Sequence, residues 1–178
     1  VTFRLYKKFL KNLKSEKLIN IYEIFEKPLI KILAFMEIEG VEIDSKFLTS
    51  LSKKFEKKIL TLEKDIFKIS KKEFNIGSPK QLGEIIYNDL KIAGLKKTKK
   101  GGFATSASVL EDLAFKGNKF PKLILDWRQL SKLKNTYSDA LPEHVNPTTK
   151  RVHTSFLLAA TTTGRLASSD PNLQNIPI

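Results

Sequence analysis

The sequence contains no cysteine and only two histidines, His144 and His153, in 178 residues. A catalytic thiolate and a Cys/His zinc site are therefore both excluded. Long apolar runs are also missing. The most apolar stretch, residues 28–36, is interrupted by Lys31 and falls well short of the ~20 residues that cross a bilayer. The start of the chain lacks a signal-peptide pattern, so we expect no membrane partner.

Acidic residues are scarce relative to basic ones, with 19 Asp and Glu against 32 Lys and Arg, for a formal charge of +13. Such an excess favours a polyanionic partner such as nucleic acid. A compositional bias towards Lys, Ile and Asn would also raise the charge without any ligand. That alternative does not explain the placement of the four arginines, Arg4, Arg128, Arg151 and Arg165.

Apolar residues recur at helical spacing through most of the chain. Two stripes near the start, Leu5–Leu13 and Ile21–Met36, predict helices that face a core, and Asp44 or Ser45 is expected to cap the next one. The apolar positions of 47–70 predict the longest helix, about 35 Å at 1.5 Å per residue. Further helices are expected over 79–90, 109–115 and 121–137; the first of these begins at the capping box Ser78-Pro-Lys-Gln81.

Two segments break this helical pattern. Residues 91–104 carry a run of lysines beside Gly101 and Gly102, which predicts an exposed basic loop. From Val152 to Leu157 the apolar residues alternate, as in a half-buried strand. The sequence therefore predicts a mainly α protein with long antiparallel helices up to about residue 142, followed by a small antiparallel β element.

The last eighteen residues, Thr161-Thr-Thr-Gly-Arg-Leu-Ala-Ser-Ser-Asp-Pro-Asn-Leu-Gln-Asn-Ile-Pro-Ile178, contain too little apolar matter to form a core. Gly164 permits a close backbone approach, and the Arg165 guanidinium can reach a base edge or a phosphate. Amides and guanidinium groups donate to the purine N3 and pyrimidine O2 acceptors that every base pair shows in the minor groove. The pattern thus predicts contact with duplex DNA that is independent of its sequence.

The residues offer no catalytic centre. Two-metal phosphoryl transfer needs converging carboxylates, but Asp170 is the single acid in the last thirty residues and its place before Pro171 is typical of a turn. His153, alone in its predicted strand, is interpreted as a structural hydrogen-bonding residue.

Several stretches together resemble bacterial DNA polymerase I and its relatives, the family A DNA polymerases. They are Glu26–Leu29, Gly40–Asp44, Phe74–Leu82, Leu133–Tyr137, Arg151–Thr154 and the terminal motif. The resemblance implies three regions: 1–40, the last helices of an exonuclease-like domain; 41–142, a helical thumb with a basic tip loop near 91–104; and 143–178, the start of the palm. Because the first residue is Val1 and the motif runs to the last residue, we expect the chain to be part of a longer polypeptide.

The resemblance also implies the partners and the contact residues. Double-stranded primer-template DNA would be held by the residues Arg165, Asn172, Gln174, Asn175, Arg128, Lys132, Thr163, Gly164, Lys96, Lys97, Lys99 and Lys100. The complete protein is expected to be a DNA-directed DNA polymerase of replication and repair that uses Mg²⁺ and deoxynucleoside triphosphates. This chain would be monomeric, cytoplasmic at the nucleoid, without a bound cofactor and inactive alone, because the family's palm carboxylates lie outside it.

Two other interpretations remain open from the sequence. The chain could be an autonomous basic helical module that binds nucleic acid without catalysis, which predicts strong, salt-sensitive binding by the chain itself. It could also be an interaction protein whose long amphipathic helix pairs with another chain, which predicts self-association without DNA affinity.

Overall fold

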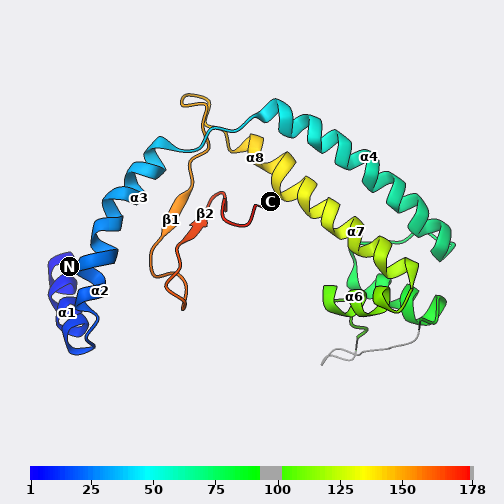
Figure 1. Cartoon of the computed structure of the whole chain (residues 1–178), viewed down its shortest axis with the longest axis horizontal. Helices are drawn as coiled ribbons and strands as arrows, with labels where there is room; N and C mark the ends of the chain where they lie inside the picture. Colours follow the sequence, from blue (N-terminus) through cyan, green and yellow to red (C-terminus); the bar gives the residue numbers. More distant parts are fainter. Residues whose placement is uncertain (93–101, 177–178) are drawn as a thin grey trace. The chain divides into compact units, whose positions relative to one another are not determined.

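The computed structural model describes residues 1–92 and 102–176. Contacts divide the chain into two compact units: unit 1 combines Val1–Ile43 with Glu143–Ile178, and unit 2 spans Asp44–Pro142 (Figure 1). Within the described residues, no helix is both long and apolar enough to cross a membrane. The expected fold class, mainly helical with a small antiparallel β element, is confirmed. The assignment of the segments to named polymerase regions stays a prediction.

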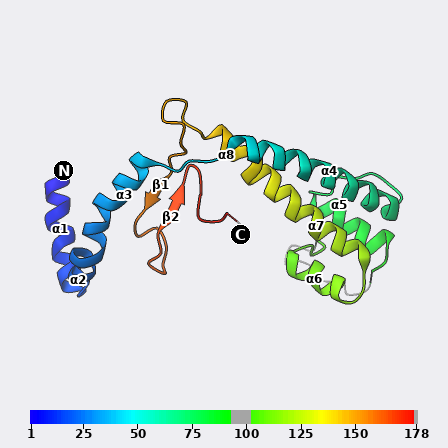
Figure 2. The same cartoon turned by 45° about the horizontal axis from the view of Figure 1, so that its top comes forward.

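Unit 2 is built on two long helices, α4 (Ser45–Ser70) and α7 (Lys119–Leu133), which lie side by side and run in opposite directions (Figures 1 and 2). Helix α4 begins where predicted, because the Asp44 carboxylate accepts a hydrogen bond from the Phe47 amide at 2.9 Å. At its other end Lys71 adopts a left-handed conformation with φ 57°. The predicted longest helix is therefore confirmed.

The core of unit 2 lies where α5 (Pro79–Glu84) and α6 (Ala107–Phe115) pack against the two long helices. Its fully buried side chains are Ile66, Leu82, Ile85, Ile86, Leu110, Leu113 and Ile124. At its margin the Trp127 indole donates a hydrogen bond to the Glu63 carboxylate at 3.0 Å, which links α7 to α4. This polar contact satisfies the one polar atom of a large, partly buried ring.

The predicted capping box forms in a modified way. The Ser78 hydroxyl accepts from the Gln81 amide at the start of α5, as expected, but the Gln81 side chain accepts from the Asn75 amide at 2.7 Å instead of the Ser78 amide. The Ser78 amide donates to the Asn75 carbonyl. The side chain thus ties the preceding turn to the helix.

Several predicted helices change to π-helical geometry along their length. The π-helical segments are η1 (Tyr22–Glu26), η2 (Ile85–Asp89) and η3 (Lys134–Asp139); η3 joins α7 to the short helix α8 (Ala140–Glu143). Within η3 the Asp139 carboxylate accepts hydrogen bonds from the Ser52 hydroxyl of α4 and from the Lys134 ammonium. The insertion therefore presents Asp139 to α4.

Unit 1 starts with the helices α1 (Thr2–Ser15), α2 (Ile19–Ile21) and α3 (Lys27–Glu39). The expectation that their apolar stripes face a core is wrong for the described chain. Phe9 is 55% exposed, Phe25 63% and Ile32 53%, whereas Leu33 is buried. No element in the described part of unit 1 covers most of these positions, and periodicity identifies an apolar side of a helix without showing what lies over it.

The β element of unit 1 is a hairpin of β1 (Ser155–Leu157) and β2 (Ala167–Ser169), with Phe156 opposite Ser168. Upstream, Val152 forms isolated bridges with Val41 and Val145. The Glu37 carboxylate of α3 accepts a hydrogen bond from the Phe156 amide at 2.6 Å. These contacts fix the hairpin on α3.

Candidate nucleic-acid interface

The loop between β1 and β2 is organised around the Thr161 hydroxyl. This oxygen donates to the Arg165 carbonyl and accepts from the Arg165 amide, both at 2.9 Å, and Thr163 donates to it at 3.4 Å. Gly164 completes the turn with φ 71°. Because no atom lies within 4 Å of the place where its Cβ would be, the backbone conformation, not space, favours glycine there.

This loop holds the Arg165 backbone at two points and leaves its side chain in solvent. The residue is exposed, and its guanidinium makes no ion pair or hydrogen bond with any residue in 1–92 or 102–176. Thr163 and Gly164 are exposed beside it. A planar five-donor group on an anchored backbone is a good ligand for nucleic-acid acceptors.

The tail after β2 folds back to the base of the same loop. Gln174 donates from its side-chain amide to the Leu166 carbonyl at 2.9 Å, and its backbone amide donates to Asn172 Oδ1 at 3.0 Å. The buried Ser168 hydroxyl accepts from the Leu173 amide and donates weakly to Asn172 Oδ1 at 3.4 Å. The structure therefore brings the predicted residues Arg165, Asn172 and Gln174 together.

These bonds correct one part of the expectation that the amides all point to a ligand. One N–H of Gln174 and the carbonyl oxygen of Asn172 are used to shape the tail. Each amide group carries two N–H donors, so Gln174 retains one and Asn172 retains two for an external acceptor. Asn172, Gln174 and Asn175 are all exposed.

Arg128 has a structural partner that the sequence did not reveal. On α7 its guanidinium donates to the Thr105 carbonyl at 2.6 Å, which ties the segment before α6 to α7. Partial burial lowers the pKa of Arg128 from its usual value, although a guanidinium stays charged at neutral pH. Lys132, one turn further along α7, is exposed.

The sequence model described as DNA polymerase family A matches residues 45–178. The chain belongs to this family.

Curated DNA polymerase I sequences match nearly the whole chain. DNA polymerase I of Rhizobium leguminosarum is 51% identical over 178 residues, which are 100% of this chain and 18% of that protein. The thermostable DNA polymerase I of Thermus caldophilus is 46% identical over 177 residues, 98% of this chain and 21% of that protein. The chain thus spans about a fifth of the length of these curated relatives.

A solved structure of the same family has a similar fold. The POL domain of Pol1 from M. smegmatis, in complex with DNA primer-template and dNTP, matches with a TM-score of 0.90 and 34% sequence identity. The match covers 99% of this chain and 31% of that chain. The likeness to family A polymerases inferred from the sequence motifs is therefore confirmed.

The remaining predicted contact residues, Lys96, Lys97, Lys99 and Lys100, lie outside the described residues. Contact between these four lysines and DNA stays a prediction.

The described acids do not fit a magnesium pair. Within 1–92 and 102–176 no three His, Asp or Glu side chains gather closely enough to hold a metal ion. Asp170 is exposed and lies in a bend directly after β2, with φ 55°. The described acids therefore offer no binding site for a pair of Mg²⁺ ions.

His153 has the structural role predicted for it. Its Nδ1 lies 2.8 Å from the Glu37 carbonyl and its Nε2 lies 2.6 Å from the Thr149 hydroxyl. With Nδ1 protonated, the ring donates to the carbonyl and accepts from Thr149. Arg151 has a similar role, because it donates to the Gly40 carbonyl at 3.2 Å and pairs with Glu39 and Glu42.

Proposed function

We propose that this chain is the duplex-holding part of a template-directed DNA polymerase, and that its hairpin and tail contact the minor groove of primer-template DNA. The observation that carries the proposal is the exposed Arg165 guanidinium, which pairs with no described residue, on a loop anchored by Thr161 beside the amides of Asn172 and Gln174. Membership of DNA polymerase family A supports the choice of ligand.

The chemistry of the minor groove explains why such a site suits a polymerase. Purine N3 and pyrimidine O2 accept hydrogen bonds at similar positions in all four Watson–Crick pairs, so donors placed along the groove test base-pair geometry without selecting a sequence. A mispair moves these acceptors and weakens the contact. Arg165 would act at the primer end, with Asn172, Gln174 and Asn175 as its neighbours along the duplex.

Residues of unit 2 would add contacts to the DNA backbone. The exposed Lys132 would bind a phosphate of the DNA backbone. Lys96, Lys97, Lys99 and Lys100 would act as point charges that displace condensed counterions from the DNA. Arg128 is committed to the Thr105 carbonyl through one nitrogen, and its other guanidinium N–H groups remain for a phosphate.

Catalysis would belong to the complete polypeptide. Phosphoryl transfer from a deoxynucleoside triphosphate needs carboxylates that hold Mg²⁺. We propose that these come from beyond this chain, that the chain alone binds duplex weakly and extends no primer, and that the complete protein works as a monomer in the cytoplasm at the nucleoid.

The test is primer extension by the complete polypeptide carrying Arg165→Ala. A charge-assisted hydrogen bond contributes about 1.5–3 kcal/mol, so kcat/KM should fall by roughly 10-fold or more. A primer whose terminal purine lacks N3 should slow the native protein by a comparable factor and leave Arg165→Ala little affected, because the bond is already lost. Arg4→Ala, which removes an exposed arginine of α1, is the matched control and should extend normally. Normal extension by Arg165→Ala would contradict the proposal.

A further inference from the structure

Helix α4 carries a row of lysines along its solvent side, which we call the α4 lysine face. It consists of Lys46, Lys53, Lys57, Lys64 and Lys68, all exposed. Their spacing of seven, four, seven and four residues keeps them within roughly 60° around the helix axis. The apolar residues that face the core, such as Ile66, lie about half a turn away.

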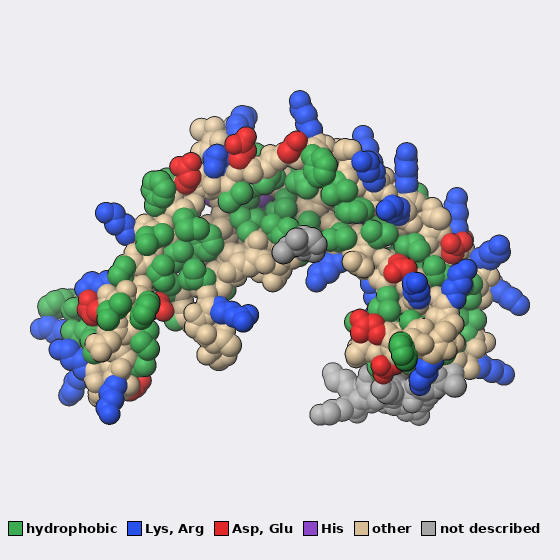
Figure 3. Space-filling model, in the orientation of Figure 1, with side chains coloured by type: hydrophobic (Ala, Val, Ile, Leu, Met, Phe, Trp, Pro, Cys, Tyr) green, Lys and Arg blue, Asp and Glu red, His purple; other side chains and the backbone are tan. Residues whose placement is uncertain are grey.

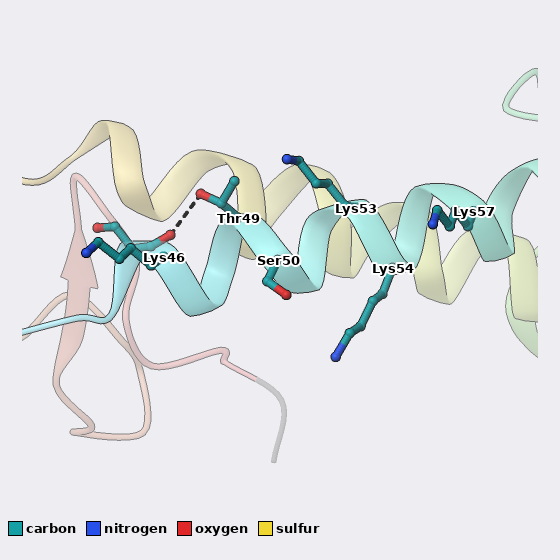
Figure 4. A pocket seen from close by; sticks show the side chains of 7 residues that line it. Lys46, Thr49, Ser50, Lys53, Lys54 and Lys57 are labelled. Carbon is teal, nitrogen blue, oxygen red and sulfur yellow. Dashed lines mark hydrogen bonds between the residues drawn. The ribbon is translucent and has the colours of Figure 1, made fainter.

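The part of this face nearest the start of α4 is also a shallow open groove. It is lined by Ser45, Lys46, Thr49, Ser50, Lys53, Lys54 and Lys57. Figure 4 shows Lys53 and Lys54 leaving the helix on opposite sides, with the Thr49 hydroxyl bonded to the Ser45 carbonyl. In the space-filling view, basic side chains project along α4 (Figure 3).

None of the five lysines forms an ion pair with a residue in the described part of the chain. Lys53 and Lys57 are four residues apart, as are Lys64 and Lys68, so each pair repels across one helical turn. The three acids of α4, Glu56, Glu63 and Asp65, lie on other sides of the helix. Glu63 accepts the hydrogen bond from Trp127 and pairs with none of the lysines. The face therefore carries concentrated positive charge that the described residues leave unneutralised.

We propose that the α4 lysine face is a second binding site for duplex DNA, which holds the phosphate backbone independently of the hairpin and tail. The choice of DNA as the polyanion rests on the proposed function. Lys46 and Lys68 are about 33 Å apart along the axis, close to the ~34 Å of one duplex turn.

An anionic membrane would be attracted by the same charge, but the helix is poorly built for it. A surface-binding amphipathic helix inserts its apolar side between lipids. The apolar side of α4 is instead packed in the core of unit 2, where Ile66 is fully buried. Flexible lysine ammonium groups suit sequence-independent contact with phosphates.

The test uses the complete polypeptide that carries this chain, with Lys53, Lys57 and Lys64 replaced together by Gln. Binding to a blunt duplex without a primer end is followed by fluorescence anisotropy over a series of salt concentrations. Each phosphate contact contributes about 0.9 to the slope of log K against log salt, so the slope should become shallower by about 2–3. Because the three side chains are exposed and their replacement relieves the repulsion between Lys53 and Lys57, the melting temperature should not fall.

A control protein with Lys8, Lys11 and Lys31 replaced by Gln loses the same charge from exposed helical positions in unit 1. Its slope should stay within about 0.5 of the native value. An unchanged slope in the α4 variant, or an equal loss in the control, would overturn the proposal. So would lysine-dependent binding to phosphatidylglycerol vesicles with DNA binding intact.

The same measurements keep this site separate from the proposed polymerase function. Primer extension by Arg165→Ala tests the hairpin and tail, whereas the blunt duplex reports the α4 lysine face without a primer end. If the two sites act independently, Arg165→Ala and the triple α4 change combine additively in the binding free energy.

Discussion

The Thr161 hydroxyl provides a way to test whether the loop geometry, and not only the Arg165 charge, matters for DNA binding. Replacement of Thr161 by Val keeps the branched shape and removes the oxygen. It deletes the two 2.9 Å bonds to the Arg165 backbone, while Arg165 itself is unchanged. The Thr161 carbonyl can still accept from the Gly164 amide at 3.3 Å.

The expected magnitude follows from these two bonds. Each contributes about 0.5–1.5 kcal/mol, and because the loop is exposed, water replaces part of what is lost. We expect a net loss of about 1 kcal/mol, which corresponds to roughly 5-fold weaker binding to primer-template. The loss should be smaller than that of Arg165→Ala, since Thr161 acts by positioning Arg165.

The assay is equilibrium binding of the complete polypeptide to primer-template DNA. Thr161→Ser keeps the hydroxyl and should bind as the native protein does. Thr162→Val, at an exposed neighbour for which no hydrogen bond is found among the described residues, is the matched control and should also bind normally. In an Arg165→Ala background, Thr161→Val should have no further effect. Native affinity for Thr161→Val, or an equal loss for Thr162→Val, would refute the positioning role.

Two further predictions concern the stability of unit 2. Ile66→Ala removes a fully buried side chain and should lower the free energy of unfolding by about 2–5 kcal/mol, whereas Leu60→Ala, at a 51% exposed position of the same helix, should change it by less than about 1 kcal/mol in denaturant titration; similar losses would contradict the assigned core. Hydrogen bonds from Lys134 and then Ser52 lower the pKa of Asp139, so its stabilisation is present at neutral pH and is lost as the pH falls below about 4 through that lowered pKa. The carboxylate is partly exposed and solvent screens the pair, so Asp139→Asn should cost only about 0.5 kcal/mol at pH 7, and this cost should shrink as the pH falls through the lowered pKa; a cost that does not change with pH would argue against the ion pair.

Local chemistry in the sequence predicted much of the fold correctly. Asp44 and Ser78 both cap helices where expected, because an N-cap depends on a few adjacent residues. The alternation from Val152 to Leu157 likewise gave the right burial pattern. The low apolar content of the terminal motif predicted a segment outside the core, and Arg165, Asn172 and Gln174 are exposed.

Features that depend on distant residues were missed. Arg128 was expected to contact DNA, but the guanidinium donates to a carbonyl 23 residues earlier, a partner that no local pattern shows. The stripes of α1 and α3 were interpreted as core, although their exposed positions show that an apolar side needs a covering element. The Gln174 bond to Leu166 depends on the fold of the tail.

The π-helical segment η3 has a consequence for how unit 2 tolerates changes in length. A π turn accommodates one more residue than an α turn, so residues after Asp139 are rotated by about 100° relative to an uninterrupted helix. Loss of a single residue between Lys134 and Asp139 would let the helix regularise and would leave the buried Leu141 facing its present surroundings. A one-residue deletion there is therefore expected to do less harm than the same deletion within α4, where it would shift the register of everything that follows.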